Sequence, residues 1–147
     1  MKNVILLFAS ILFLYSCYKK DQVNYPRKIN QVLIGKGDLT GDENITEQNL
    51  VINTQADFSF ILDKMQSITL NSLTETNIDF NNYTVIAVFD SIKPTFGYHI
   101  TISNIIENSD SITVSIIESG SLTATLEVAQ PFHIVKIPKT TKPVIFQ

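Results

Sequence analysis

The stretch that decides the fold of this chain is Val85-Ile86-Ala87-Val88-Phe89, an unbroken apolar run. A strand that is covered on one face alternates apolar and polar side chains, whereas this run is apolar at both odd and even positions. We therefore predict a strand that is buried on both faces, at the centre of a sheet, with a helix packed across one of those faces.

The helix expected on that face spans about residues 54–66. Thr54 and Asp57 have the three-residue spacing of a capping box, which marks a helix N-terminus. A 3.6-residue period then predicts one apolar stripe, formed by Phe58, Ile61, Leu62 and Met65. Phe60 falls on the opposite side of the helix and would need a partner elsewhere.

Alternating segments after the central strand predict a hairpin. Residues 98–103 and 111–116 each carry apolar side chains at every second position, and residues 107–110 between them have the composition of a turn. The alternation indicates that this hairpin buries one face and exposes the other. Further strands are expected at residues 122–126, 131–137 and 144–146.

The sequence before the helix leaves two strand arrangements open. Residues 32–34 are an apolar stretch, a turn-rich piece follows, and residues 48–52 have the composition of a return strand, so the two segments form either a hairpin or two short edge strands. The sum is an α+β domain: a mostly antiparallel sheet of six to eight strands with one amphipathic helix packed on it.

The N-terminus has the features of an export signal. Lys2 precedes an apolar run from Val4 to Leu14, and a basic start followed by a short apolar core is typical of a secretory leader. The run is shorter than the roughly 20 apolar residues of a transmembrane helix. The alternative interpretation is a buried N-terminal helix whose cysteine lies in the core.

Cys17 is the only cysteine, and Leu14-Tyr15-Ser16-Cys17 resembles the lipobox of bacterial lipoproteins. The resemblance implies that residues 1–16 are a signal peptide and that Cys17 carries the lipid. Tyr18 follows the cysteine in place of the Asp that resembles an inner-membrane retention signal, which favours the outer membrane. Residues 17–29 are then a lipidated cysteine and polar tether, and residues 30–147 form the domain.

Composition excludes several classes of function. The net charge of −3 leaves no basic surplus to attract phosphates, which argues against nucleic acid as a partner. A lipidated Cys17 leaves no thiol for disulfides, zinc–thiolate sites or cysteine catalysis. Serines are abundant but lack the Gly-x-Ser-x-Gly context, and no glycine loop for phosphate is present. We therefore predict no enzyme activity, no catalytic residue and no cofactor.

Two segments resemble a known family. Val85–Ile100 contains Lys-Pro-Thr and Gly-Tyr after an apolar strand, and Gln130–Lys139 reads Gln-Pro-Phe-His-Ile-Val-Lys-Ile-Pro-Lys. Together they are similar to the PrcB C-terminal domain family, over about residues 32–146. The family is named for a lipoprotein subunit of a bacterial surface protease complex, so the resemblance implies a supporting rather than a proteolytic role. This chain has Phe96 where the family pattern has a small residue.

The loop inside the first segment is the candidate partner-binding site. Pro94 fixes its own φ and Gly97 permits a tight turn, which would place Phe96 outward at the tip. An aromatic side chain on a stiff loop loses little entropy on binding. The alternative is a plain β-turn with Phe96 folded onto the core. The candidate residues are Lys93, Pro94, Thr95, Phe96, Gly97 and Tyr98.

Metal sites are not expected. His99 and His133 could align on adjacent strands, but no third ligand is evident for zinc. A loose match to a calcium loop is formed by Asp38, Thr40, Asp42 and Glu47. Glu43 occupies the position where an EF-hand needs Gly, so a turn is predicted instead. Two short strings, Asp90-Ser91-Ile92 and Asp110-Ser111-Ile112, resemble acceptors of bacterial O-glycans; the alternative is a polar loop.

Three functions are compatible with these observations. The first is a non-enzymatic exported lipoprotein that binds or stabilises another envelope protein, such as a protease complex. The second is a protease inhibitor of the loop-insertion type, because Pro-Thr-x-Gly-Tyr resembles a loop of the chagasin-type inhibitors. The third is a small hydrolase or ligand carrier, which would need a deep pocket lined by convergent polar groups.

Overall fold

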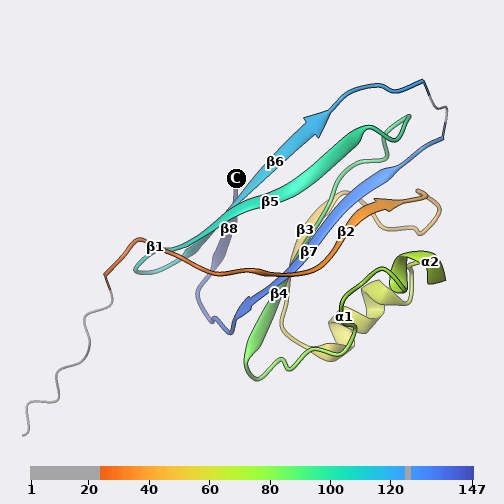
Figure 1. Ribbon diagram of the computed structural model, residues 1–147. Helices are drawn as coiled ribbons and strands as arrows, with labels where there is room; N and C mark the ends of the chain where they lie inside the picture. Colours follow the sequence, from red (N-terminus) through yellow and green to blue (C-terminus); the bar gives the residue numbers. More distant parts are fainter. Residues whose placement is uncertain (1–23, 125–126) are drawn as a thin grey trace, which may run out of the picture.

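Eight strands form two four-stranded sheets in the computed structural model, which describes residues 24–124 and 127–147 (Figure 1). One sheet has the order β1-β5-β6-β8 and the other the order β2-β7-β4-β3, and every pair is antiparallel except β6 with β8. The predicted leader and Cys17 lie outside the described residues. The elements are β1 (Arg27–Lys28), β2 (Val32–Leu39), β3 (Gln48–Ile52), α1 (Gln55–Leu62), α2 (Ser67–Leu70), β4 (Tyr83–Phe89), β5 (Tyr98–Glu107), β6 (Ile112–Gly120), β7 (Gln130–Pro138) and β8 (Val144–Phe146).

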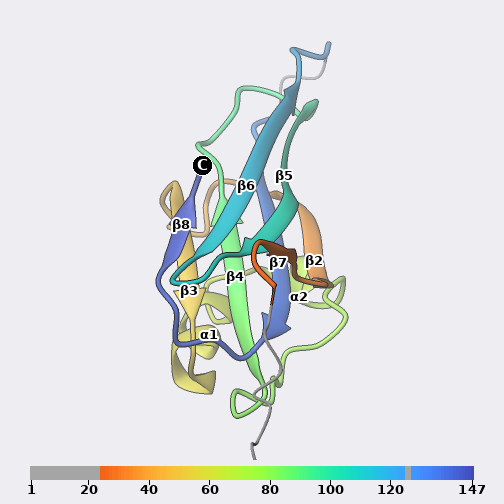
Figure 2. The ribbon, with the colours of Figure 1, turned by 90° about the vertical axis from the view of Figure 1, so that its left-hand side faces the viewer.

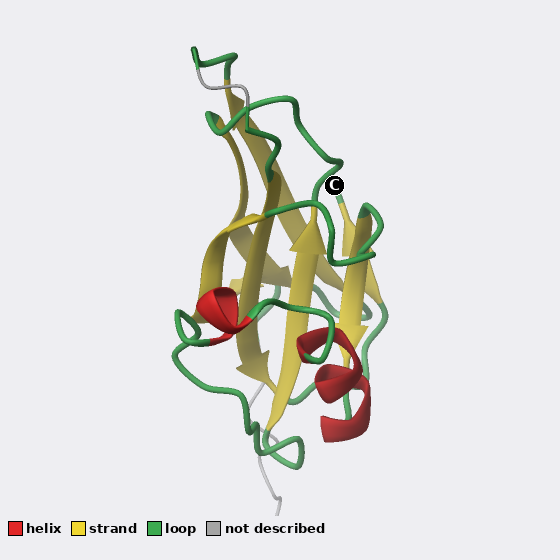
Figure 3. Cartoon of the chain, turned by 90° about the vertical axis from the view of Figure 1, so that its right-hand side faces the viewer, coloured by secondary structure: helices red, strands yellow, loops and turns green. Residues whose placement is uncertain are grey.

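The elements stack in three layers, which Figures 1 and 3 show from different sides. The sheet β1-β5-β6-β8 packs on one face of the sheet β2-β7-β4-β3, and the two helices cover the other face. The mostly antiparallel α+β architecture predicted from the sequence is confirmed, with two packed sheets in place of one.

The central strand β4 behaves as its composition predicts. It lies between β7 and β3, and its side chains alternate between two separate cores. Val85, Ala87 and Phe89 pack in the core under the helices, while Ile86 and Val88 pack against the other sheet. All of these side chains are buried, so the prediction of a strand covered on both faces is confirmed.

The predicted helix is present and capped as expected. The Thr54 hydroxyl accepts a hydrogen bond from the Asp57 backbone N–H at 3.1 Å and donates one to the Asp57 carboxylate at 2.6 Å. The predicted stripe is buried, whereas Phe60 is 64% exposed. The helix itself ends at Leu62, and Met65 reaches the core from the turn that leads to α2.

The predicted hairpin is formed by β5 and β6, and both strands extend beyond the predicted ranges. A β-bulge between Ile102 and Asn104 shifts the register, so that Ile105 also points into the core. The bulge was not predicted, because the apolar alternation of the sequence does not mark it.

The open choice for the first two segments is resolved in favour of edge strands. β2 pairs with β7, and β3 pairs with β4, so the two strands lie at opposite edges of the same sheet. They cannot form a hairpin, because β7 and β4 lie between them.

The predicted strand at 122–126 is wrong for the residues that the structure describes. Gly120 ends β6, and residues 121–124 have no strand pairing but cross toward the loop before β5. Leu122 is 68% exposed, so its apolar alternation does not mark a buried face. Thr125 and Leu126 lie outside the described residues.

The predicted tether contains a short strand. Arg27 and Lys28 pair with Glu107 and Ile106 as β1, and the Arg27 side chain lies 2.5 Å from the Glu107 carboxylate. Lys142 binds the same carboxylate at 2.8 Å, so residues 27–28 are tied to the domain. Together the two cations hold the pKa of Glu107 below its usual range, Lys142 having the larger effect.

Candidate functional site

The predicted partner-binding loop lies at the end of the domain opposite β1. Arg27 pairs with Glu107 at one end of β5, while the loop leads into Tyr98 at the other end. A strand of ten residues is about 30 Å long. Figures 1 and 2 show the loops before β5 and after β6 side by side at this end.

Two glycines at the base of the loop let the backbone segments meet. A Cβ atom on Gly120 would lie 1.8 Å from the Gly97 carbonyl oxygen, and one on Gly97 would lie 2.4 Å from the Ser121 carbonyl oxygen. The Ser121 N–H donates a hydrogen bond to the Gly97 carbonyl at 3.1 Å. No side chain fits at either position, so the close approach depends on glycine.

Further hydrogen bonds join the loop to Thr123 and Ala129. The hydroxyls of Thr95 and Thr123 are 2.5 Å apart, and the Thr123 N–H donates to the Thr95 hydroxyl at 3.1 Å. Lys93 and Ala129 exchange two backbone hydrogen bonds of 2.7 and 3.1 Å. Thr95 is buried by this contact, so the two loops form one structural unit.

Apolar side chains are exposed on this unit. Phe96 is 37% exposed and does not pack in either core cluster. It shares the two joined loops with three other exposed aliphatic side chains. We call this set the loop-end patch; it consists of Ile92, Phe96, Leu122 and Val128.

The two sheets are joined along one side by side chains. Near Ile102 the outer edge of β5 is not paired with β1, which reaches only Glu107 and Ile106. The Ile102 N–H donates to Nδ1 of His133 at 2.8 Å, and its carbonyl accepts from the Gln31 amide at 3.0 Å. On this side the sheets are therefore held together.

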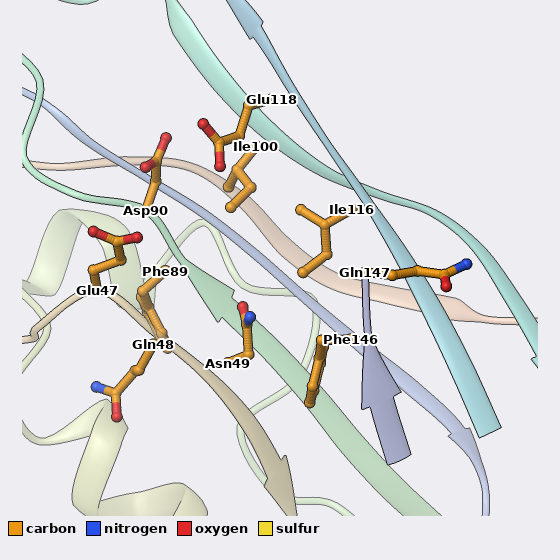
Figure 4. Close-up of a pocket in the computed structure, with 10 residues that line it drawn as sticks. All are labelled: Glu47, Gln48, Asn49, Phe89, Asp90, Ile100, Ile116, Glu118, Phe146 and Gln147. Atoms are coloured by element: carbon orange, nitrogen blue, oxygen red, sulfur yellow. The ribbon is translucent and has the colours of Figure 1, made fainter. Parts of the chain in front are cut away.

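On the opposite side the sheets leave a cavity of about 560 Å³, which we call the acidic cleft. It lies between β3 of one sheet and β6 and β8 of the other, and Figure 4 shows its side chains. One part of its lining is apolar and another part is polar or charged. The lining residues are Glu47, Gln48, Asn49, Phe89, Asp90, Ile100, Ile116, Glu118, Phe146 and Gln147.

Asp90 is a buried acidic residue of this cleft, with 3% of its surface exposed. Its Oδ1 accepts hydrogen bonds from the Ser91 N–H at 2.6 Å and from the Lys93 ammonium at 2.8 Å. This contact with Asp90 is the main reason that the pKa of Lys93 lies above its ordinary value, with Glu118 and Glu47 adding smaller effects. Lys93 thus links the predicted loop to the acidic cleft.

The two histidines do not form a pair on adjacent strands, because β5 and β7 belong to different sheets. His133 is buried, and the loss of hydration lowers its pKa to about 4, with a smaller contribution from the charge of Lys36. The Ile102 N–H can donate to Nδ1 only when that nitrogen carries no proton, which is the case in a neutral imidazole ring. His99 is exposed on β5.

The turn predicted at residues 38–47 is closed by Glu43, which the sequence marked only as a mismatch to the EF-hand pattern. The Glu43 carboxylate is buried and accepts hydrogen bonds from the backbone N–H groups of Thr40 at 3.0 Å and Gly41 at 2.9 Å. Within residues 24–124 and 127–147, no cluster of His, Cys, Asp or Glu has the arrangement of a metal site.

Sequence reasoning did not bring Glu47, Asp90 and Glu118 together. Each is a single acidic residue in a different part of the chain, and only the packing of β3, β4 and β6 around one cavity unites them. The two serines of the glycan-like strings differ in setting: Ser91 bonds to Asp90 and Lys93, and Ser111 lies at the β5–β6 turn.

Comparison of the chain with known protein families, with characterised proteins and with solved structures finds no significant match. Among the helices of the described residues, none is long and apolar enough to cross a bilayer.

Proposed function

We propose that this protein is a non-enzymatic lipoprotein of the bacterial envelope that binds another exported protein through its loop-end patch. The observation that carries the proposal is the set of exposed apolar side chains on two loops that are bonded to each other. Rigid apolar anchors bind with a small entropic cost, which suits them to protein contacts.

The placement of the patch supports the same role. The described chain begins near the β1 end of the domain, and the patch lies about 30 Å away at the other end of β5. If Cys17 is lipidated, the tether enters the domain at the end remote from the patch, which leaves the patch free to meet a partner. The resemblance to the PrcB C-terminal domain family adds a protease complex as the kind of partner.

Site-specific photocrosslinking tests the proposed surface. A benzophenone amino acid replaces Phe96 in cells, and a matched variant carries it at Phe60, a more exposed phenylalanine on the outer side of α1. We expect one defined envelope protein to be crosslinked from position 96 and not from position 60. Equal adducts from both positions, or none from position 96, would contradict the proposal.

The lipid anchor is tested separately. Cells fed a clickable fatty acid should label the wild-type protein, and Cys17→Ser should abolish the label. A chain whose first sixteen residues remain attached to an unmodified thiol would refute the anchor and leave the loop-end patch to be judged by crosslinking alone.

A loop-insertion protease inhibitor is the second candidate, favoured by the same bonded base of the loop. It predicts dose-dependent inhibition of an exported protease by the purified protein, and loss of inhibition in Phe96→Ala but not in Phe60→Ala. Absence of inhibition across serine, cysteine and metalloproteases would remove this candidate.

A further inference from the structure

The acidic cleft carries a charge imbalance that the proposed function does not use. Glu47, Asp90 and Glu118 line it, and Lys93, which is bonded to Asp90, is the nearby cation. Among the described residues that line this cleft and the pocket beside it, three carboxylates and one ammonium leave a formal excess of two negative charges. Figure 4 shows the three carboxylates on the side of the cavity away from Phe146 and Gln147.

Hydrogen-bonding capacity in the cleft is unfilled. Oδ2 of Asp90 is buried and, within the part of the chain that the structure describes, accepts no hydrogen bond. A buried acceptor without a partner costs free energy, and native structures contain few of them. Among the same described residues, the carboxylates of Glu47 and Glu118 have no hydrogen bond and no close ion pair, and they interact with Lys93 only at longer range.

The apolar part of the lining gives the cleft a second property. Ile100, Ile116 and Phe146 lie beside the carboxylates, from β5, β6 and β8. A chain of methylene groups can pack on such a surface while its charged end stays among polar groups. The volume of about 560 Å³ is in the range of sites for small ligands.

We propose that the acidic cleft binds a cationic nitrogen, an ammonium or guanidinium group, carried on an apolar chain. The exposed carboxylates of Glu47 and Glu118 make the contacts with the cation and supply the uncompensated negative charge, while buried Asp90, whose Oδ1 is paired with Lys93, adds a smaller attraction. Hydrogen bonds between ionised partners are about twice as strong as neutral ones, which makes these groups the main source of affinity. The proposal does not depend on the loop-end patch.

This chemistry has two possible sources, a free organic amine or the lysine or arginine side chain of a protein segment. The full-length chain in detergent is titrated with 1,5-diaminopentane and, separately, with the peptide Gly-Gly-Lys-Gly-Gly, and binding is followed by calorimetry and by the amide resonances of Asn49 and Gln147. The same peptide with norleucine in place of lysine keeps the methylene chain and removes the charge.

We expect at least one cationic probe to bind, the norleucine peptide not to bind, and affinity to fall as salt rises, because exposed charges are screened. Binding of diaminopentane assigns the cleft to free amines, and binding of the lysine peptide alone assigns it to a protein segment. Failure of both probes overturns the proposal.

Variants locate the binding. Glu47→Gln and Glu118→Gln should each weaken binding by about threefold to tenfold, while Asp63→Asn, which removes the same charge at the end of α1, should leave it unchanged. Because all three side chains are exposed, the variants should fold, and thermal melting verifies this. An equal loss of affinity in all three variants would show that binding depends only on the net charge of the protein, and would refute the site.

Discussion

Gly120 is the residue at which the backbone of the candidate loop is most constrained. Its φ is +106°, a conformation that side-chain-bearing residues rarely adopt, and its Cα faces the Gly97 carbonyl. The sequence contains five glycines, and the structure shows that these two bring the loops after β4 and β6 together.

A substitution at Gly120 should therefore be costly. Gly120→Ala is expected to lower the free energy of unfolding by about 2 kcal/mol or more, because the backbone conformation is unfavourable and the new methyl group meets a carbonyl oxygen. Gly37→Ala is the matched control, since its nearest neighbour would be an ordinary contact at 3.6 Å. Urea unfolding followed by circular dichroism measures both, and equal midpoints would contradict the argument.

His133 makes stability depend on pH. Its pKa is about 4 in the folded protein and about 6.5 in the unfolded chain, so the unfolded chain takes up the proton first as the pH falls. The contribution of His133 to the free energy of unfolding is constant above pH 6.5. It decreases as the pH falls from 6.5 to 4, by roughly 3 kcal/mol in total.

The measurement is the free energy of unfolding across that pH range. His133→Gln should flatten the dependence, whereas His99→Gln, at an exposed position, should leave it in place. A direct reading comes from the ring resonances of His133, and a midpoint near 6.5 in the folded protein would refute the assignment.

At the scale of elements, α1 is held by its apolar stripe rather than by its length. The helix spans only Gln55–Leu62, and isolated helices of this length are not stable in water. Phe58 is fully buried and its ring meets Phe80 edge-on at 6.3 Å between centroids, so it connects the helix to the chain that leads into β4.

Two phenylalanines on this helix provide a matched test. Phe58→Ala should destabilise the protein by about 3–5 kcal/mol, because it opens a cavity in the core. Phe60→Ala should change stability by no more than about 0.5 kcal/mol, because its side chain is mostly exposed. Thermal or urea unfolding of the two variants decides the point, and comparable losses would show that the outer side of α1 is also packed.

At the scale of the whole molecule, the strands differ in how completely they are covered. β4 and β7 are interior in their sheet and buried on both faces, whereas β1 and β8 are short edge strands. The deepest packing is thus in the middle layer, and the acidic cleft lies at the edge formed by β3 and β8.

Hydrogen exchange should follow this order. Amide protons of Val85–Val88 and Ile134–Val135 are expected to exchange only through global unfolding, and those of Arg27–Lys28 and Val144–Phe146 through local opening, at rates faster by orders of magnitude. Exchange followed by NMR or mass spectrometry checks this, and uniform protection across both sheets would contradict it.

Local patterns in the sequence determined the elements that depend on neighbours along the chain. The capping box at Thr54, the apolar stripe of α1, the two-sided burial of Val85–Phe89 and the β5–β6 hairpin all follow from periodicity, because such patterns reflect which faces of an element meet water. The same patterns misplaced a strand at residues 122–126, where no partner strand pairs with the described residues 121–124.

Only the tertiary structure decided what lies next to what. The placement of β2 and β3 at opposite edges, the division into two sheets and the joining of the loops at Gly97 and Gly120 depend on pairing between segments far apart in the chain. The acidic cleft is the strongest case, because Glu47, Asp90 and Glu118 show no common motif. They lie close together because three separate strands pack around the acidic cleft, and no local pattern of residues predicts that packing.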